Sequence, residues 1–405
     1  MQDSHRQIVI VTVGVFTILQ IVVLLVFGYT PYPDSEGYIY YAKECIAHHE
    51  LYPVSTLLNE YHFLWNIGAI NLAALSLYIF HSIIPLLVVY SLMKGSMAWM
   101  LYAITKKMSN PQTALTSLML FVIYPANYGE GTSLLSELPF MFFIFVALYL
   151  VIVKEWYLPG GMSLALANWF RPMAIVFLLA LCIYMMYKWR KSMKIIVGYA
   201  VIILFIGLAS MHRTGLFLYQ AKTGWMALTD YSTHHAAASM NVRERHDWNV
   251  SQKDAAWRSQ FFDWLKEHPV EYVKQMPEKI FITYVSDNVN ICTFIPDKTA
   301  KEYMYEEISM LSLYRHFPML TTVQWLTVLN LIIYYLLLTA AVLSVIFCFR
   351  NNALLLPVSI IVSGTLVLLL AGHGEARFHI PFMPFVIIMS ALFINQISYG
   401  KSRVD

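Results

Sequence analysis

Long apolar runs recur along the chain and determine its predicted architecture. A helix needs about 20 apolar residues to cross the ~30 Å hydrocarbon core of a bilayer. Runs close to this length cover residues 8–28, 82–105, 112–128, 134–153, 173–188, 194–211, 323–349, 353–371 and 379–398. A shorter run, 159–170, fits the first arm of a hairpin with 173–188. The pattern therefore predicts an all-α integral membrane protein with about ten transmembrane helices.

Residues 63–80 form one further apolar stretch. Counting it as a span would place Lys106 and Lys107 opposite the other basic connectors, so we expect a juxtamembrane helix on the outer face. The first run, 8–28, lacks a small-residue cleavage site and is expected to remain as a span. We expect three regions: a transmembrane module at 1–211 with a first outer loop at 29–81, a helical extracytoplasmic loop at 212–320, and C-terminal transmembrane helices at 321–405.

Composition narrows the class of protein. Hydrophobic residues make up 59% of the 405 residues and charged residues only 13%, which excludes a soluble enzyme and a disordered chain. The net charge of +3 without a basic block excludes a nucleic-acid partner. Four cysteines exclude a disulfide scaffold. Cys45 and Cys292 both fall on the outer side, as two free thiols or as one disulfide.

The charges are concentrated in the 212–320 loop, which holds 25 of the 51 charged side chains. Its pattern is helical. Ser251-x-x-Asp254 resembles a capping box, and Trp257 and Phe261 follow on one helix face. Pro269 is expected to begin a second helix. Such faces usually pack on neighbouring helices or on the membrane surface.

Basic residues orient the predicted helices. With the N-terminus inside, the cytoplasmic connectors hold the following basic residues: Arg6, Lys106, Lys107, Lys154, Lys188, Arg190, Lys191, Lys194, Arg350, Lys401 and Arg403. The short outer connectors hold only Lys43, Arg171 and Arg377. This asymmetry predicts that both termini lie inside.

The first outer loop carries Asp34, Glu36 and Tyr38 just beyond the first span. Asp34 or Ser35 is suited to capping a short helix that runs through Ala47. The alternative is that the two carboxylates belong to a catalytic site, and a helix cap does not exclude that role.

Three further positions are ambiguous in the same way. Glu137 begins an apolar helix, where a carboxylate complements the positive helix end, and it could also bind substrate. Arg171 at the tip of the 159–188 hairpin suits either lipid headgroups or a bound phosphate. Lys94 falls inside the 82–105 run, where it faces the bundle interior, extends to the interface or contacts a lipid phosphate.

The connector before the last span places ionisable groups at alternate positions: His373, Glu375, Arg377 and His379. In an extended or turn geometry all four would point the same way. Ionisable groups at a membrane boundary are costly, so a functional site is favoured over a solvated interfacial belt.

Five short motifs occur in one order along most of the chain: Asp34-Ser-Glu-Gly-Tyr38, Pro125 with Ser136-Glu137, Asn168-Trp-Phe-Arg171-Pro172, His268-Pro269-Val-Glu-Tyr272, and Glu375-Ala-Arg377-Phe378-His-Ile-Pro381. In this order the chain resembles the GT-C superfamily of polytopic glycosyltransferases. It is most similar to bacterial relatives of dolichyl-phosphate-mannose protein mannosyltransferases and of the lipid A aminoarabinose transferase. The chain departs from the pattern of this family in two expected features. The large loop is expected between spans seven and eight, and no separate soluble C-terminal domain is expected to follow. Both departures concern acceptor specificity.

The resemblance implies an inverting transfer of a sugar from a polyprenyl-phosphate donor to an extracytoplasmic lipid, glycan or protein. It implies an inner-membrane enzyme of envelope biogenesis whose active site is on the periplasmic face. No organic cofactor is expected, and a divalent cation is compatible with the chemistry. The implied roles are Asp34 as general base with Glu36 in reserve; Arg377, Arg171, His373, His379 and Lys94 on the donor phosphate; and Glu137, Glu375 and Tyr38 on the substrates. The alternative is a transporter or flippase for a lipid-linked glycan.

Overall fold

A computed structural model describes residues 2–233, 241–296, 298, 308–317, 319–372 and 374–401. Every regular element in the described residues is a helix, and none is a β-strand. Leu64 and Lys222 make an isolated antiparallel bridge. Six helical segments in this part of the chain are long and apolar enough to cross a membrane. The chain is therefore a helical membrane protein, and ten spans remain a prediction.

The long segments contain helices α1 (Gln2–Phe27), α4 (Ile84–Met108), α9 (Trp189–Thr214), α17 (Thr322–Phe347), α18 (Leu355–Ala371) and α19 (Met383–Lys401). Short 3₁₀ turns precede three of them: η5 (Met186–Lys188), η7 (Asn352–Leu354) and η8 (Ala376–Phe382). A seventh candidate consists of the segments Pro125–Thr132 and Glu137–Val153, which are bent by 112°.

Four shorter apolar helices explain the difference from the predicted count. They are α5 (Pro111–Ile123), α6 (Glu137–Leu148) with the π turn η4 (Tyr149–Val153), α7 (Tyr157–Phe170) and α8 (Ala174–Tyr184). A fifth, α3 (Ile67–Phe80), lies in the stretch at 63–80 that was not counted as a span. A helix rises 1.5 Å per residue, so the 11 residues of α8 reach only about 16 Å. Apolar runs that look continuous in sequence are interrupted here by 3₁₀ turns or by polar connectors.

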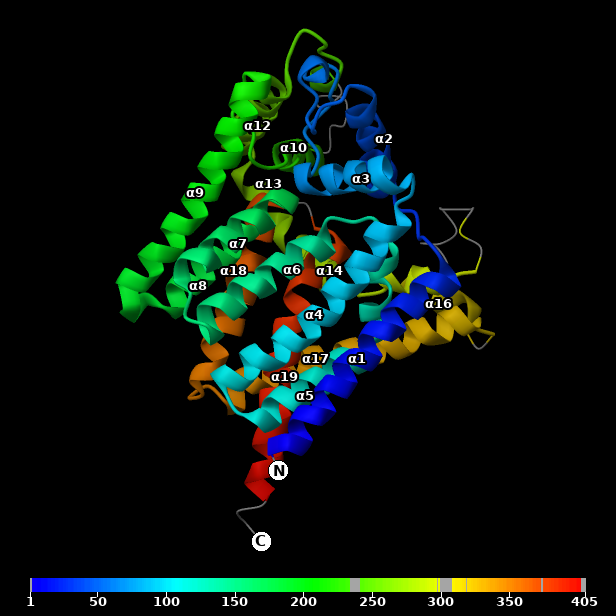
Figure 1. Cartoon of the computed structure of the whole chain (residues 1–405), viewed down its shortest axis with the longest axis vertical. Coiled ribbons are helices and arrows are strands. Elements are labelled where there is room, and N and C mark those ends of the chain that lie inside the picture. Colours follow the sequence, from blue (N-terminus) through cyan, green and yellow to red (C-terminus); the bar gives the residue numbers. More distant parts are fainter. Residues whose placement is uncertain are drawn as a thin grey trace.

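The remaining helices lie mainly at one end of the bundle or along its side. They are α2 (Pro33–Ala47), α10 (Gly224–Thr233), α12 (Val250–Glu267), α13 (Pro269–Lys274), α14 (Met276–Tyr284) and α16 (Met310–His316), with 3₁₀ turns η1 (Ser55–Leu57), η2 (Pro125–Tyr128), η3 (Glu130–Thr132) and η6 (Val289–Phe294). Figure 1 shows α2, α3, α10 and α12 together at the end opposite the start of α1 and the end of α19. This end carries the candidate site.

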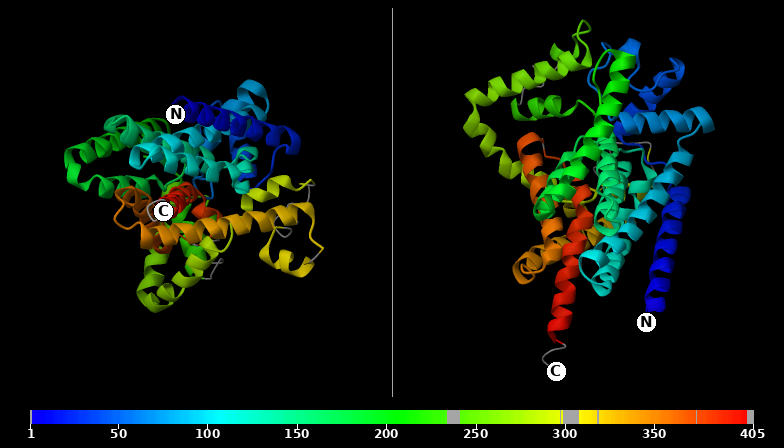
Figure 2. Two further views of the ribbon diagram at one scale, coloured as in Figure 1. Left: turned by 90° about the horizontal axis from the view of Figure 1, so that it is seen from below. Right: turned by 60° about the vertical axis from the view of Figure 1, so that its left-hand side comes forward.

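Close helix packing determines the position of the α7–α8 hairpin. A Cβ atom on Gly161 of α7 would lie 1.9 Å from the carbonyl oxygen of Ile195 on α9, and one on Gly198 would lie 2.2 Å from that of Leu158. Small residues let the two backbones approach in this way, as is common between membrane helices. Because α7 is held against the much longer α9, the hairpin tip lies partway along α9 (Figure 2).

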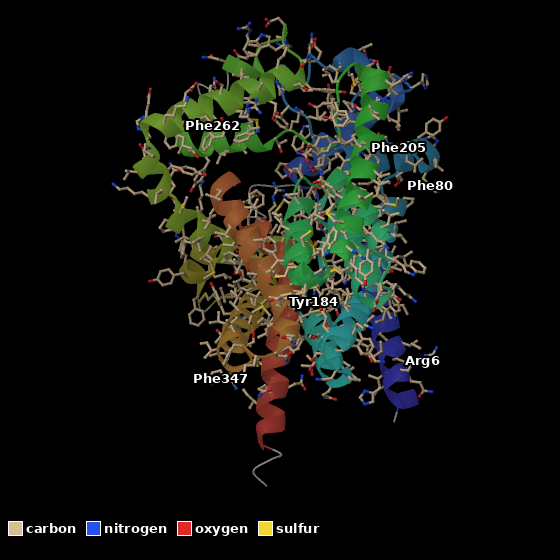
Figure 3. The ribbon with its side chains drawn as sticks, turned by 90° about the vertical axis from the view of Figure 1, so that its left-hand side faces the viewer. Arg6, Phe80, Tyr184, Phe205, Phe262 and Phe347 are labelled. Atoms are coloured by element: carbon tan, nitrogen blue, oxygen red, sulfur yellow. The ribbon has the colours of Figure 1, made fainter. Side chains whose placement is uncertain are left out.

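Apolar side chains on the outer surface are typical of a membrane-embedded bundle. Phe205 of α9 is 69% exposed and Phe347 of α17 is 62% exposed, and Figure 3 shows both at the periphery. A soluble monomer rarely exposes apolar surface over several helices, whereas lipid tails solvate it.

The structure tests the helix starts that were predicted for the 212–320 loop. Helix α12 does begin with a capping box, but Asn249 and Gln252 form it, so the predicted Ser251–Asp254 pair was wrong by two residues. Trp257 and Phe261 are buried on one face as predicted, and Pro269 begins α13.

Candidate functional site

Helix α2 positions Asp34 in its first turn. Tyr32 occupies the N-cap position without a side-chain cap and Pro33 is the first helical residue, so the predicted capping by Asp34 or Ser35 was wrong. The predicted end at Ala47 is confirmed. Successive helical residues turn by about 100°, which places Glu36 about 200° from Asp34 on an exposed face. Glu36 therefore does not share a helix face with Asp34, and its reserve role stays a prediction.

Arg377 joins three carboxylates from distant parts of the chain. Its Nη1 lies 2.6 Å from Asp34 Oδ2 and 3.9 Å from Glu137 Oε1, while its Nε lies 2.5 Å from Glu375 Oε1. The pairing with Asp34 spans 343 positions in sequence. Arg377 is in η8 and not in an extended segment. The expectation that the ionisable groups of residues 375–379 all point the same way was therefore wrong.

Arg171 forms the second basic member of the site. Helix α7 ends at Phe170, and Arg171 adopts an extended conformation at the hairpin tip. Its guanidinium pairs with Oε1 of Glu137. Glu137 is the first residue of α6, and this helix start is the one that the sequence predicts. The Arg171 guanidinium also lies 5.8 Å from the Phe378 ring centroid. Glu137 is thus shared by both arginines.

We refer to Asp34, Glu137, Arg171, Glu375 and Arg377 as the arginine–carboxylate cluster. Its three carboxylates and two guanidinium groups are tightly packed but not sealed. The side chains of Asp34 and Arg377 retain 23% and 19% of their exposure, whereas Glu137 retains 6%. A ligand can therefore reach the Asp34–Arg377 pair without unfolding the site.

A hydroxyl–amide network supports the cluster from α2. Tyr38, one helical turn after Asp34, donates to Ser136 Oγ (3.3 Å) and accepts from Asn66 Nδ2 (2.6 Å). Ser136 in turn donates to Glu137 Oε2 at 3.4 Å. Burial and the negative charges of Asp34 and Glu137 raise the pKa of the Tyr38 hydroxyl, so it stays protonated. Asn66 was not predicted, because it carries no sequence signal beyond its place before an apolar helix.

A cleft of about 430 Å³ opens beside the cluster. It lies between the α7–α8 hairpin tip, the 217–228 segment and the end of α18. Its lining residues are Asn66, Arg171, Pro172, Met173, Phe217, Tyr219, Gln220, Ala221, Lys222, Thr223, Gly224, Trp225, Ala227, Leu228, Asp254, Val367, Leu368, Gly372 and Phe378. Arg171, Asn66 and Phe378 connect the cleft to the cluster. The cleft was missed in the sequence because it is assembled from six separate segments.

Two residues predicted to bind phosphate lie elsewhere. Lys94 is fully buried, and its Nζ lies 2.7 Å from Glu130 Oε2. His379 is also fully buried; its Nδ1 contacts the Thr283 carbonyl oxygen (2.7 Å), and its Nε2 lies 3.6 Å from Asp287. Neither lines the cleft. His373, which was also predicted to bind phosphate, lies outside the described residues.

The polar interior around Glu130 and Asp287 forms a second group. Tyr124 donates its hydroxyl to Asp287, and Asn330 Nδ2 donates to the Asp287 carbonyl oxygen at 2.6 Å. A void of about 10 Å³ separates this group from Glu137 and Arg377. That volume matches about one water molecule.

The described residues hold neither a metal-binding cluster nor a disulfide. Within the described ranges, no three His, Cys, Asp or Glu side chains converge to hold a metal ion, and a role for a divalent cation remains a prediction. Cys45 and Cys292 are buried free thiols, so the disulfide alternative is wrong.

The chain matches no protein-family model, and no curated protein matches it in sequence. The fold and site define a helical membrane protein with a partly exposed arginine–carboxylate cluster beside an amphipathic cleft. Two guanidinium groups can bind an anion bidentately, and Asp34, which pairs with Arg377, is a carboxylate that can accept a proton.

Proposed function

We propose that the protein is a membrane glycosyltransferase of the GT-C type. It would move a sugar from a polyprenyl-phosphate donor to an extracytoplasmic acceptor. The observation that carries this proposal is the Asp34–Arg377 pair: a candidate base and a phosphate-binding group, 343 residues apart in sequence, meet beside an amphipathic cleft. Sugar transfer from a lipid phosphate needs these two groups together.

The chemistry follows from the charges of the cluster. Asp34 takes the proton from an acceptor hydroxyl as its oxygen attacks the anomeric carbon. The bond between that carbon and the phosphate oxygen breaks, and the lipid phosphate leaves with one additional negative charge. Arg377 and Arg171 stabilise that charge as it develops. A single displacement without a covalent intermediate inverts the anomeric centre.

The ion pairs also explain how water would be kept from reacting. Asp34 is paired with Arg377, whose Nε is held by Glu375. A donor phosphate competes for the Arg377 guanidinium and releases Asp34 as the base. Asp34 would then be available only when a donor is bound.

Topology completes the proposal. Ten spans with both termini inside would place the cluster on the extracytoplasmic side of the inner membrane. The basic connectors support this orientation. The cluster also lies away from the end of the molecule where α1 begins and α19 ends (Figure 1).

The decisive experiment measures sugar transfer by purified protein. The full chain in lipid nanodiscs is incubated with a panel of polyprenyl-phosphate sugars, and the released lipid phosphate is quantified. Asp34→Asn should reduce transfer about 10²–10⁴-fold, as expected for loss of a general base. Glu44→Gln removes another carboxylate from the same helix and should leave transfer unchanged. Full transfer by folded Asp34→Asn would refute the role of Asp34.

One observation favours a transporter instead: the buried Lys94–Glu130 pair lies within the bundle, near the bent segments at 125–153. Charges and broken helices at mid-membrane are features of transporters. Vesicles containing the protein and a lipid-linked sugar distinguish the two functions. Movement of the sugar lipid between leaflets without release of lipid phosphate would favour the transporter.

A further inference from the structure

The cleft beside the cluster has two chemically different kinds of wall. Aromatic and aliphatic side chains line much of it, including Phe217, Trp225 and Leu368. The side chains of Lys222 and Asp254 form a polar strip on the same cavity, paired at 3.2 Å and retaining 24% and 18% of their exposure. An aliphatic chain would remove water from this ion pair without offering it a hydrogen bond, which is costly.

The side chain of Trp225 packs against aromatic side chains of α12. Its ring centroid lies 6.0 Å from that of Phe261 and 5.5 Å from that of Phe262, both on α12. An aromatic side chain fixed in this way loses little conformational freedom when a ligand packs on it. Trp225 therefore provides a rigid apolar surface on the cleft wall.

The polar strip is equally fixed. The Lys222 backbone N–H donates to the Leu64 carbonyl oxygen at 2.8 Å, which ties the strip to the first outer loop. Asn168 on α7 donates to Gln220 Oε1 at 2.7 Å, another lining residue. Hydrogen-bonding groups thus stand at defined positions around the aromatic surface.

A sugar ring matches this combination. It presents an apolar face of C–H groups to an aromatic ring and directs hydroxyls sideways to charged and amide groups. The volume of about 430 Å³ is near the lower end of small-molecule sites, which suits one or two sugar rings rather than a folded protein.

We propose that this cleft is the acceptor subsite and that the acceptor is a saccharide. The proposal rests on the glycosyltransferase function given above. Trp225 packs on a sugar ring, while Lys222 and Asp254 bind its hydroxyls. The reacting hydroxyl points to the part of the cleft wall that Arg171 forms. Arg171 shares Glu137 with Arg377, and Arg377 holds Asp34.

Ligand binding tests the proposal without requiring transfer. The full chain in nanodiscs is studied by saturation-transfer NMR with trisaccharides of glucose, mannose, galactose and N-acetylglucosamine, and with decyl phosphate as a lipid-phosphate probe. At least one trisaccharide should bind. Trp225→Leu and Asp254→Asn should each weaken that binding about tenfold, which is near the upper end of the range for one aromatic contact and the lower end of the range for one charged hydrogen bond.

A matched control is Trp325→Leu, which removes a 50% exposed tryptophan on α17 outside the cleft lining and should not change binding. Two cleft variants guard against misfolding of either one, and gel filtration checks each. Asp34→Asn should reduce transfer about 10²–10⁴-fold yet leave trisaccharide binding intact.

Each outcome decides one of the two proposals. Trisaccharide binding that depends on Trp225, without transfer from any donor, would support the saccharide subsite and refute the transferase. Binding of decyl phosphate alone, or of no probe, would overturn the saccharide acceptor. Transfer to a peptide or an aliphatic alcohol that is unaffected by Trp225→Leu would overturn it as well.

Discussion

The buried Lys94–Glu130 pair allows a quantitative test of the fold. Lys94 is 0% exposed and Glu130 is 8% exposed, and the ammonium also lies 5.0 Å from the Phe121 ring centroid. Lys94→Met removes one charge at nearly constant volume and leaves the Glu130 carboxylate buried. Lys94→Met combined with Glu130→Gln removes both charges.

The two variants should differ greatly in stability. At 2.7 Å and an effective dielectric constant of about 20, the Coulomb attraction is about 6 kcal/mol, and the desolvation of two ions offsets much of it. Removing one partner should cost about 3–5 kcal/mol because the other charge stays buried and unpaired. Removing both should cost less than about 1 kcal/mol.

The assay is a double-mutant cycle on the full chain in detergent. Unfolding by sodium dodecyl sulfate is followed by far-ultraviolet circular dichroism for the wild type, both single variants and the double variant. A large coupling energy between Lys94 and Glu130 is expected. If the double variant is as unstable as Lys94→Met, the pair is not a self-contained structural unit and the reasoning is refuted.

Three further predictions concern single residues. Arg377→Lys replaces a planar guanidinium by a point charge and should lower the initial rate of transfer about 10²-fold, whereas an unchanged rate would contradict its proposed role. Burial lowers the pKa of the Lys279 ammonium from 10.5 to about 8. Because the folded state binds this proton more weakly, the wild type should gain stability between about pH 8 and pH 10.5, and that gain should be absent from Lys279→Met. Burial raises the pKa of the Cys45 thiol to about 12, so maleimide should not label it at neutral pH, whereas Glu60→Cys on the exposed loop should react.

Hydropathy predicted where apolar helices occur but not how far they extend. The run at 112–128 contains α5, which ends at Ile123, and the remainder turns into η2. An apolar composition is compatible with a short helix, a bent pair or a full span, so ten predicted spans correspond to six clear candidates. Length along one axis depends on tertiary packing, which single-sequence hydropathy does not contain.

The candidate site shows a similar division. Charges are rare outside the 212–320 loop, and the sequence therefore predicted that a few of them gather at the outer face: Asp34, Glu36, Glu137, Arg171, Glu375 and Arg377. The structure brings together all of these except Glu36. The sequence did not predict their pairing, since the rotation of η8 separates His379 from Arg377 and the helical start of α2 separates Glu36 from Asp34. Asn66 and the cleft residues were missed because polar side chains in connectors carry no distinctive pattern.

Exposure distinguishes the two polar groups of the molecule. Lys94 and Glu130 neutralise each other, and neither they nor Asp287 lines the cleft, which fits a structural role. The arginine–carboxylate cluster instead has three carboxylates for two arginines, and both members of its Asp34–Arg377 pair remain partly exposed. A pair that can exchange partners with a ligand is suited to chemistry, while a sealed pair is suited to holding helices together. The proposed reaction therefore belongs to the cluster at the cleft and not to the more deeply buried charges.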